Sequence, residues 1–142
     1  MSDIPLLPQV DTFLARHHAL FIDGGSVQSH SSRTLDVINP ATGQVIAQVA
    51  DADPADVDAA VDSARRGFKQ WSQVAPAVRG NVLLKLADLL EQHREELAQI
   101  ETCQSGKLIH IARAFEVDQA AHFLRYYAGW ATKITGETIT PS

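Results

Sequence analysis

Cys103 is the side chain in this sequence that could act as a covalent nucleophile through a thiolate. It is the sole cysteine among the 142 residues, and it lies near the end of a predicted helix that stops at Ser105-Gly106. A reactive thiolate needs a cationic neighbour or a helix N-terminus, and the C-terminal end of a helix dipole opposes thiolate formation. We therefore interpret Cys103 as a small core residue.

The acidic residues and histidines show no pattern typical of acid–base catalysis or of a metal site. Glu116 and Asp118 are two positions apart on a predicted helix, so they face different sides. The six histidines are scattered without ligand spacing, and neither HExxH nor CxxC occurs. The phosphate-binding patterns GxGxxG and GxxxxGK[ST] are also missing from the sequence. The residue pattern alone therefore predicts no catalytic or cofactor-binding residue.

Composition limits the class of protein and of partner. The chain is 45% hydrophobic and 20% charged, which is typical of one ordinary globular domain. Its net charge is −5 and it has no run of Lys or Arg, so we expect neither a nucleic acid nor a membrane as partner. A lone cysteine excludes an internal disulfide, and the N-terminus lacks the pattern of a secretory signal. These features predict a cytoplasmic protein.

The first 50 residues combine a Pro-punctuated arm with short strands. A tight turn is predicted at Asp23-Gly24-Gly25, because these residues tolerate positive φ. Alternation of apolar and polar residues after Gly43 suits a strand with one face covered. We expect two or three antiparallel strands. The predicted pieces are a helical patch at 10–14, strands at 20–22, 35–38 and 45–49, and polar turns or loops at 26–33 and 39–43.

Three helices are predicted after residue 50. Asp53 and Pro54 are typical of a helix start, and the first helix runs to Trp71. The second spans 79–107. The three- or four-residue spacing of its apolar residues is interrupted near His93, which predicts a kink or two helices. The third spans 108–131. Apolar stripes expected to be buried comprise Val57, Ala60, Val61, Ala64 and Phe68 in the first helix, and Leu83, Leu86, Leu90, Leu97 and Ile100 in the second.

The last residues predict the start of a strand. Gly136 turns the chain, and Thr138, Ile139 and Thr140 are β-prone. A strand without a partner is an exposed edge, which complete domains usually avoid. The sequence therefore indicates a piece of a longer protein, and we expect exposed apolar side chains on the third helix, at Phe123, Tyr127 and Trp130.

The motifs taken in order resemble the N-terminal segment of the aldehyde dehydrogenase superfamily. They are FIDGG, DVINPATGQVIAQV, DADPADVDAAVDSARRGFKQW, RGNVLLKLADLLEQHREELAQIET, SGK, FLRYYAGWA and GETI, and they span residues 20–142. The nearest subgroup is the phenylacetaldehyde dehydrogenase type. The resemblance implies an α+β fragment of the family's α/β fold, in which an N-terminal β-hairpin precedes a cluster of about four helices and an unpaired terminal strand.

The resemblance also implies an activity, NAD(P)-dependent oxidation of an aldehyde to the carboxylic acid, with an aromatic aldehyde such as phenylacetaldehyde as one candidate. In this family a Cys attacks the aldehyde, hydride passes to the nicotinamide, and a Glu-activated water hydrolyses the thioester. Those groups and the cofactor loop belong to a part of the family's sequence beyond the position of Ser142. We therefore assign no catalytic residue here, expect NAD or NADP only in the full-length protein, and expect this segment alone to be inactive.

Two minor sites are implied by the same resemblance. Counting back from RYYAGWA places Phe115, Glu116 and Gln119 at the substrate tunnel, although Phe115 could equally be plain core. A monovalent cation would be held by carbonyls at Val37 and Ile38 and by the side chain of residue 104. Gln104 stands there in place of the usual carboxylate, which removes a charge but keeps a carbonyl oxygen.

The implied organisation has three parts. They are an N-terminal arm with a short helix (1–19), a hairpin and helices that pack on the cofactor domain (20–134), and the start of an oligomerisation strand (135–142). The full-length protein is expected to be a homo-oligomer that meets its aldehyde through the remainder of the chain. The alternative is a truncated, non-catalytic binding or regulatory module that pairs with full-length subunits.

Overall fold

The N-terminal arm is a short helix fastened to a distant part of the chain. The structure, a computed structural model, describes residues 5–136. Helix α1 (Pro8–Leu14) begins at a proline, whose missing N–H costs nothing in the first turn. Val10 is 1% exposed, and the backbone N–H of Leu7 donates to the Gln99 side-chain oxygen at 2.8 Å. This bond joins residues 92 positions apart, so α1 is held in place by a later helix.

The predicted turn at 23–25 closes a two-stranded hairpin. Strand β2 (Leu20–Ile22) pairs antiparallel with β3 (Gly25–Val27). Asp23 and Gly24 have φ of 57° and 79°, the left-handed region that the turn requires. The prediction of a polar loop over 26–33 is therefore wrong at its start, because β3 extends to Val27.

The second sheet has the strand order β1-β5-β4. Strand β4 (Thr34–Ile38) pairs antiparallel with β5 (Val45–Ala50), as the sequence predicts, through a turn in which Gly43 has a φ of 72°. Strand β1 (His17–His18) lies parallel to β5 on the other side. The sequence analysis missed this strand, because two residues carry too little pattern to predict a non-local pairing.

The next three helices begin and end close to the predicted positions. Helix α2 (Pro54–Trp71) has Asp53 as its N-cap residue, with a reciprocal capping box to Asp56. Helices α3 (Pro76–Gln92) and α4 (Arg94–Ser105) meet at His93, which confirms the predicted break. Gly106 ends α4 with a φ of 75°, as the Ser105-Gly106 stop signal predicts.

The helix predicted over 108–131 is divided. Helix α5 (Ile109–Ile111) leads into a π-helical segment, η1 (Ala112–Val117), and α6 (Asp118–Trp130) follows. A single π turn inserts residues without breaking the chain direction, so its sequence resembles that of an α-helix. Among residues 5–136, the structure has no helix that combines the length and the apolar character needed to cross a membrane.

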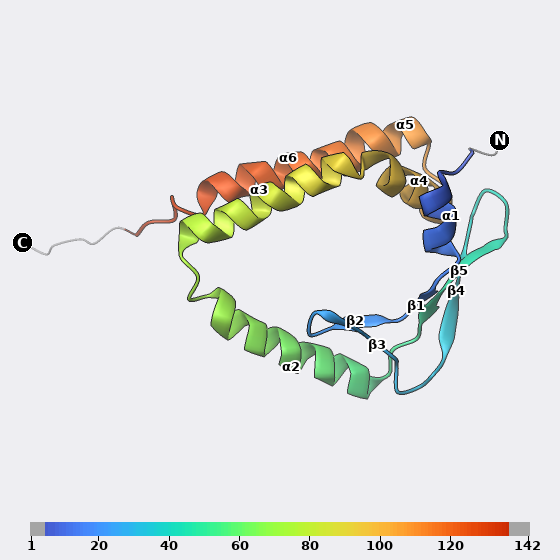
Figure 1. Cartoon of the computed structure of the whole chain (residues 1–142), viewed down its shortest axis with the longest axis horizontal. Coiled ribbons are helices and arrows are strands. Elements are labelled where there is room, and N and C mark those ends of the chain that lie inside the picture. The colour runs from blue at the N-terminus through green and yellow to red at the C-terminus, as the bar shows by residue number, and fades with distance from the viewer. Residues whose placement is uncertain (1–4, 137–142) are drawn as a thin grey trace, which may run out of the picture.

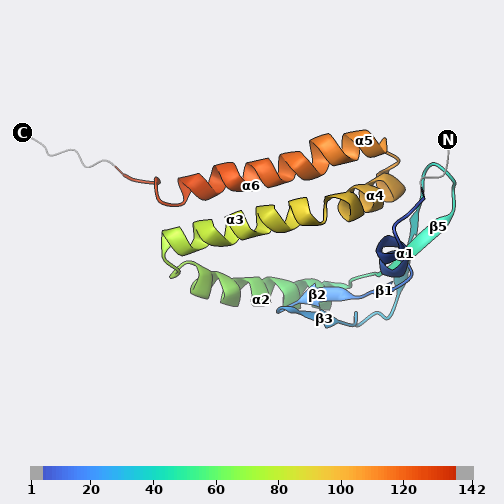
Figure 2. The same ribbon diagram turned by 45° about the horizontal axis from the view of Figure 1, so that its top comes forward.

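Helices α3 and α6 lie side by side (Figures 1 and 2), and the buried residues of both helices are small. Gly80 and Ala87 on α3 are buried, seven positions apart, and so are Ala121 and Ala128 on α6. A Cβ added at Gly80 would lie 3.0 Å from the backbone oxygen of Ala128. The two backbones therefore approach closely at this end of the pair.

The apolar stripe predicted to be buried in the first helix is wrong throughout, because all five of its residues are exposed, Ala60 and Ala64 included, and the stripe of the second helix is wrong in part. Val57, Val61 and Phe68 on α2 are exposed, Phe68 by 69%, and the buried residue of α2 is Asp56. Leu86 on α3 is also exposed. Figure 1 shows α2 along the edge of the molecule opposite α3 and α6, and the described residues leave Val57, Val61 and Phe68 of its apolar face exposed. The spacing of apolar residues correctly predicted that α2 has an apolar face, but it could not predict which surface covers that face.

The exposure expected at the end of the third helix is confirmed. Phe123, Tyr127 and Trp130 on α6 are 51%, 59% and 46% exposed. The predicted strand at 138–140 lies outside the described residues.

The close contact at Gly80 predicts a strong effect of any larger side chain. Gly80→Leu should lower the free energy of unfolding by about 1–3 kcal/mol, because the new side chain meets backbone atoms of α6. Gly67→Leu is the matched control, since no atom lies within 4 Å of a Cβ at Gly67 on α2. The control should be neutral or stabilising by up to about 1 kcal/mol, from helix propensity. Equal effects of the two variants in thermal unfolding would contradict the close approach of α3 and α6.

Candidate functional site

The three residues predicted at a substrate tunnel lie at the junction of η1 and α6. Phe115 and Glu116 are in η1, and Gln119 is in the first turn of α6. All three are exposed, and Phe115 is 65% exposed. Phe115 is therefore not a core residue within residues 5–136, and its place at a substrate tunnel stays a prediction. An aromatic ring on an exposed π-helical turn is a feature that often accompanies a functional site.

Ion pairs hold this junction against α4. The Lys107 ammonium group lies 2.6 Å from the Glu116 carboxylate and 3.0 Å from that of Glu101. These two carboxylates raise the pKa of Lys107, chiefly through the hydrogen bond to Glu116. Glu116 is thus engaged in an ion pair, although it is exposed like Phe115 and Gln119. The sequence did not predict the ion pair between Glu116 and Lys107.

The three residues predicted to hold a monovalent cation come from two neighbouring segments. Val37 and Ile38 end strand β4, and Gln104 is exposed at the C-terminal end of α4. The turns that follow these elements touch, because a Cβ added at Gly106 would lie 2.9 Å from the Cγ of Pro40. The β4–β5 ladder also shifts register between Val37 and Ile38.

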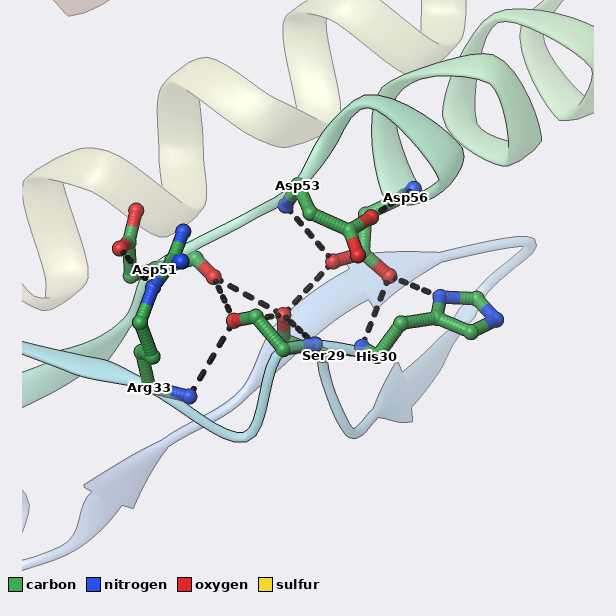
Figure 3. Close-up of polar contacts among 7 residues, drawn as sticks. Ser29, His30, Arg33, Asp51, Asp53 and Asp56 are labelled. Atoms are coloured by element: carbon green, nitrogen blue, oxygen red, sulfur yellow. Dashed lines mark hydrogen bonds and ion pairs between the residues drawn. The ribbon is translucent and has the colours of Figure 1, made fainter.

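A polar cluster that the sequence analysis missed lies at the start of α2 (Figure 3). Its centre is Asp56, which is 1% exposed and accepts four hydrogen bonds. One oxygen accepts from the Ser29 hydroxyl at 2.6 Å and from the Asp53 backbone N–H at 3.0 Å. The other accepts from the backbone N–H of His30 at 3.2 Å and from its ring Nδ1 at 2.5 Å. The cluster fastens the loop before β4 to the N-terminus of α2.

The arrangement of these donors explains the role of the cluster. Ligand atoms of His30, Asp53 and Asp56 lie within 4.8 Å of one another, a spacing that could suit a metal ion. Both oxygens of Asp56 are already satisfied by protein donors, so the carboxylate has its partners without an ion. We interpret the cluster as a structural tie. An acidic residue three positions after the N-cap Asp53 is the local signal that could have revealed the contacts between Asp53 and Asp56, but not those with Ser29 and His30.

The tie predicts a defined dependence of stability on pH. The hydrogen bond to Asp56 raises the pKa of His30 above 6.5, and the bonds from Ser29 and Asp53 lower the pKa of Asp56 below 3.8. The contribution of His30 to the stability of the folded state is complete below pH 6.5, and it is lost as the pH rises through the pKa of His30 in the folded protein. The Asp56 contribution is complete above pH 3.8 and is lost as the pH falls through its folded pKa.

We therefore expect His30→Gln to destabilise the protein most between about pH 4 and pH 6.5 and less at pH 9. The measurement is the melting temperature of the variant and of the wild type across this range. His122→Gln, at an exposed position of α6, is the matched control and should leave the difference small at every pH. A difference in melting temperature between the wild type and His30→Gln that grows above pH 8 would contradict the tie.

Independently, Ser29→Ala should lower the free energy of unfolding by about 1.5–3 kcal/mol, because it removes a hydrogen bond to a buried carboxylate.

Cys103 has the surroundings of an unreactive thiol. It is half-buried on the last turns of α4. Burial, and then the negative charge of Asp11 on α1, raise its pKa above the ordinary value. A raised pKa favours the neutral thiol, which is a poor nucleophile. These surroundings support the interpretation of Cys103 as a packing residue.

The sequence is similar to those of known aldehyde dehydrogenases. A sequence profile described as the aldehyde dehydrogenase family matches residues 27–142. The phenylacetaldehyde dehydrogenase of Pseudomonas fluorescens is 46% identical over 135 residues, which are 94% of this chain and 27% of that protein. An aldehyde dehydrogenase of Aspergillus niger is 47% identical over 121 residues, or 84% of this chain and 24% of that protein. The chain thus spans about a quarter of the length of these relatives.

Solved structures agree with the sequence comparison. The NAD⁺ complex of the Bacillus cereus aldehyde dehydrogenase superimposes with a TM-score of 0.94 at 42% identity, covering 99% of this chain and 29% of that chain. The profile match covers most of the sequence, and the fold is shared almost throughout the chain. The chain therefore belongs to the aldehyde dehydrogenase family.

Proposed function

We propose that this chain is the N-terminal segment of an NAD-dependent aldehyde dehydrogenase that oxidises an aldehyde to the carboxylic acid. The observation that carries the proposal is the likeness to the NAD⁺-bound Bacillus cereus enzyme along 99% of this chain. NAD⁺ accepts the hydride when it is bound. We assign no cofactor contact and no catalytic group to residues 1–142, and the nucleophile belongs to the remainder of the protein.

The proposed role of the segment is to support the domain that binds the cofactor. Residues 20–134 would pack on that domain, with 1–19 as an arm and 135–142 as the start of an oligomerisation strand in a homo-oligomer. The exposed apolar stripe of α2 at Val57, Val61 and Phe68 supports this role, because such a stripe needs a covering surface. Burying one such side chain contributes about 1.5–3 kcal/mol.

We propose an aromatic aldehyde, such as phenylacetaldehyde, as the substrate. Phe115 presents an exposed ring beside Gln119, and aromatic rings pair favourably when stacked or edge to face. The Pseudomonas relative named for phenylacetaldehyde supports this choice. Glu116 would contribute indirectly, because its carboxylate is paired with Lys107.

A monovalent cation is proposed between β4 and the end of α4. Carbonyl oxygens of Val37 and Ile38 and the amide oxygen of Gln104 are hard donors of the kind such cations prefer. The register shift between Val37 and Ile38 supports the site, since a ladder irregularity leaves backbone groups locally unpaired. With a neutral amide in place of a carboxylate, the affinity should be low.

The direct test is aldehyde-dependent NADH formation by the protein made from the complete reading frame. We expect activity with NAD⁺ and a higher kcat/KM for phenylacetaldehyde than for acetaldehyde. A full-length protein that oxidises no aldehyde in a broad panel would overturn the proposed function. Activity with equal preference for the two aldehydes would leave the family activity standing and overturn the aromatic substrate.

A further inference from the structure

The π-helical segment η1 is positioned by two buried residues five places apart. Ala112 is fully buried and Val117 is 6% exposed, and both pack in one cluster with Ala98 of α4. On an α-helix of 3.6 residues per turn, residues five apart diverge by about 140° around the axis. Hydrogen bonds of the i→i+5 kind bring them back to one side. The π turn therefore allows both residues to face α4.

The same turn determines the side on which Phe115 stands. Gln119 and Phe123 follow Phe115 at intervals of four, and all three are exposed. Residues four apart lie on one face of an α-helix, so Gln119 and Phe123 share a face of α6, and Phe115 precedes them on the π turn. If the segment relaxed to a regular α-helix, residues before Val117 would rotate relative to those after it. Phe115 would then change its position relative to Gln119 and Phe123 of α6.

Two bidentate ion pairs bind the segment to α4 on either side of Phe115. The Arg113 guanidinium meets the Glu95 carboxylate with two contacts of 2.6 Å. Asp118 meets Arg94 in the same way, also with two contacts of 2.6 Å. Bidentate pairs fix orientation as well as distance. The π turn is thus bound at both ends to one rigid helix.

The Arg113–Glu95 pair is further supported from α1. Glu95 also accepts from the Gln99 side chain at 3.0 Å, and the Gln99 oxygen in turn accepts from the Leu7 backbone. The pairing raises the pKa of Arg113 and lowers the pKa of Glu95, so both stay charged across the working range of pH. The bond from Gln99 gives the Glu95 carboxylate a second partner besides Arg113.

We propose that Arg113 and Glu95 form a positioning pair that holds the π turn and thereby sets the substrate specificity carried by Phe115. The inference rests on the proposed function, because it requires Phe115 to line the aldehyde site. Arg113 and Glu95 do not touch the substrate in this proposal. They act through the placement of the aromatic ring, and the substrate class they favour is an aldehyde with an aromatic group.

The test compares Arg113→Met with Arg125→Met in the full-length protein. Arg125 is the matched control, because it pairs with Glu91 and Asp88 of α3 at a point beyond η1. Arg113→Met should raise the KM for phenylacetaldehyde about tenfold and leave kcat for acetaldehyde within about twofold, since misplacing a positioning group affects one substrate class. Arg113→Lys keeps the positive charge but cannot form the bidentate contact of the guanidinium group, so it should give an intermediate KM for phenylacetaldehyde.

Amide hydrogen exchange supplies a readout independent of activity. Exchange at residues 112–118 should speed up by about tenfold or more in Arg113→Met and stay unchanged in Arg125→Met. Unchanged exchange in Arg113→Met would overturn the positioning pair. The proposal would also be overturned by a second pattern. In it, Arg113→Met speeds up exchange but leaves the ratio of the KM values for phenylacetaldehyde and acetaldehyde unchanged, while Phe115→Ala alters that ratio. A wild-type protein that oxidises no aldehyde would overturn the proposed function and the link to specificity, whereas the exchange result would still decide whether the pair holds the turn.

Discussion

Residues 1–142 produced alone should oxidise no aldehyde and bind no NAD⁺, whereas the full-length protein should do both. The expected loss is complete, because residues 5–136 show no activated nucleophile. Its one thiol, at Cys103, has a pKa raised by burial and lies where the helix dipole opposes a thiolate. The measurement is NADH formation with phenylacetaldehyde, combined with calorimetric titration of NAD⁺ into each protein.

The variant Cys103→Ala of the full-length protein is the control for this expectation. It should retain its kcat, because the thiol has only a packing role, and lose at most about 1 kcal/mol of stability. Turnover by the 142-residue chain that disappears in Cys103→Ala would contradict the assignment. It would mean that the segment has a nucleophile of its own.

Phe115→Ala in the full-length protein should raise the KM for phenylacetaldehyde by about 10- to 100-fold, the equivalent of losing about 1.5–3 kcal/mol of apolar contact. The kcat for acetaldehyde should change little, since a two-carbon substrate is too short to gain from the ring. Steady-state kinetics with phenylacetaldehyde and with acetaldehyde measure both effects. The expected result rests on the proposal that Phe115, which is 65% exposed on the π turn, lines the substrate site.

Phe21→Ala is the matched control, because Phe21 is 77% exposed on the β2–β3 hairpin. Its kinetic constants should equal those of the wild type. If Phe115→Ala and Phe21→Ala have the same effect on both aldehydes, Phe115 does not line the substrate site.

Features with a local chemical signal were predicted well from the sequence. Asp53 and Pro54 mark the start of α2, and the lost step of the apolar stripe at His93 marks the division of α3 from α4. Gly24 and Gly106 adopt the positive φ that their turns require. In each case the determinant lies within a few residues of the feature, so one sequence contains all of the information.

Features that depend on distant partners were missed. Ser29 and Asp56 are 27 positions apart, and only the folded chain shows that they meet. The π turn at 112–117 depends on packing of Ala112 against α4, which periodicity cannot reveal. The stripe containing Phe68 was expected to be buried, but no other helix of the described residues covers it.

The central claim is tested most directly by the intact mass of the native gene product, read beside aldehyde-dependent NADH formation in the same sample. A mass well above 15.5 kDa, together with activity, is the result that we predict. A mass near 15.5 kDa without activity would contradict the proposed enzyme. It would favour a non-catalytic module that binds full-length subunits through its apolar helix faces.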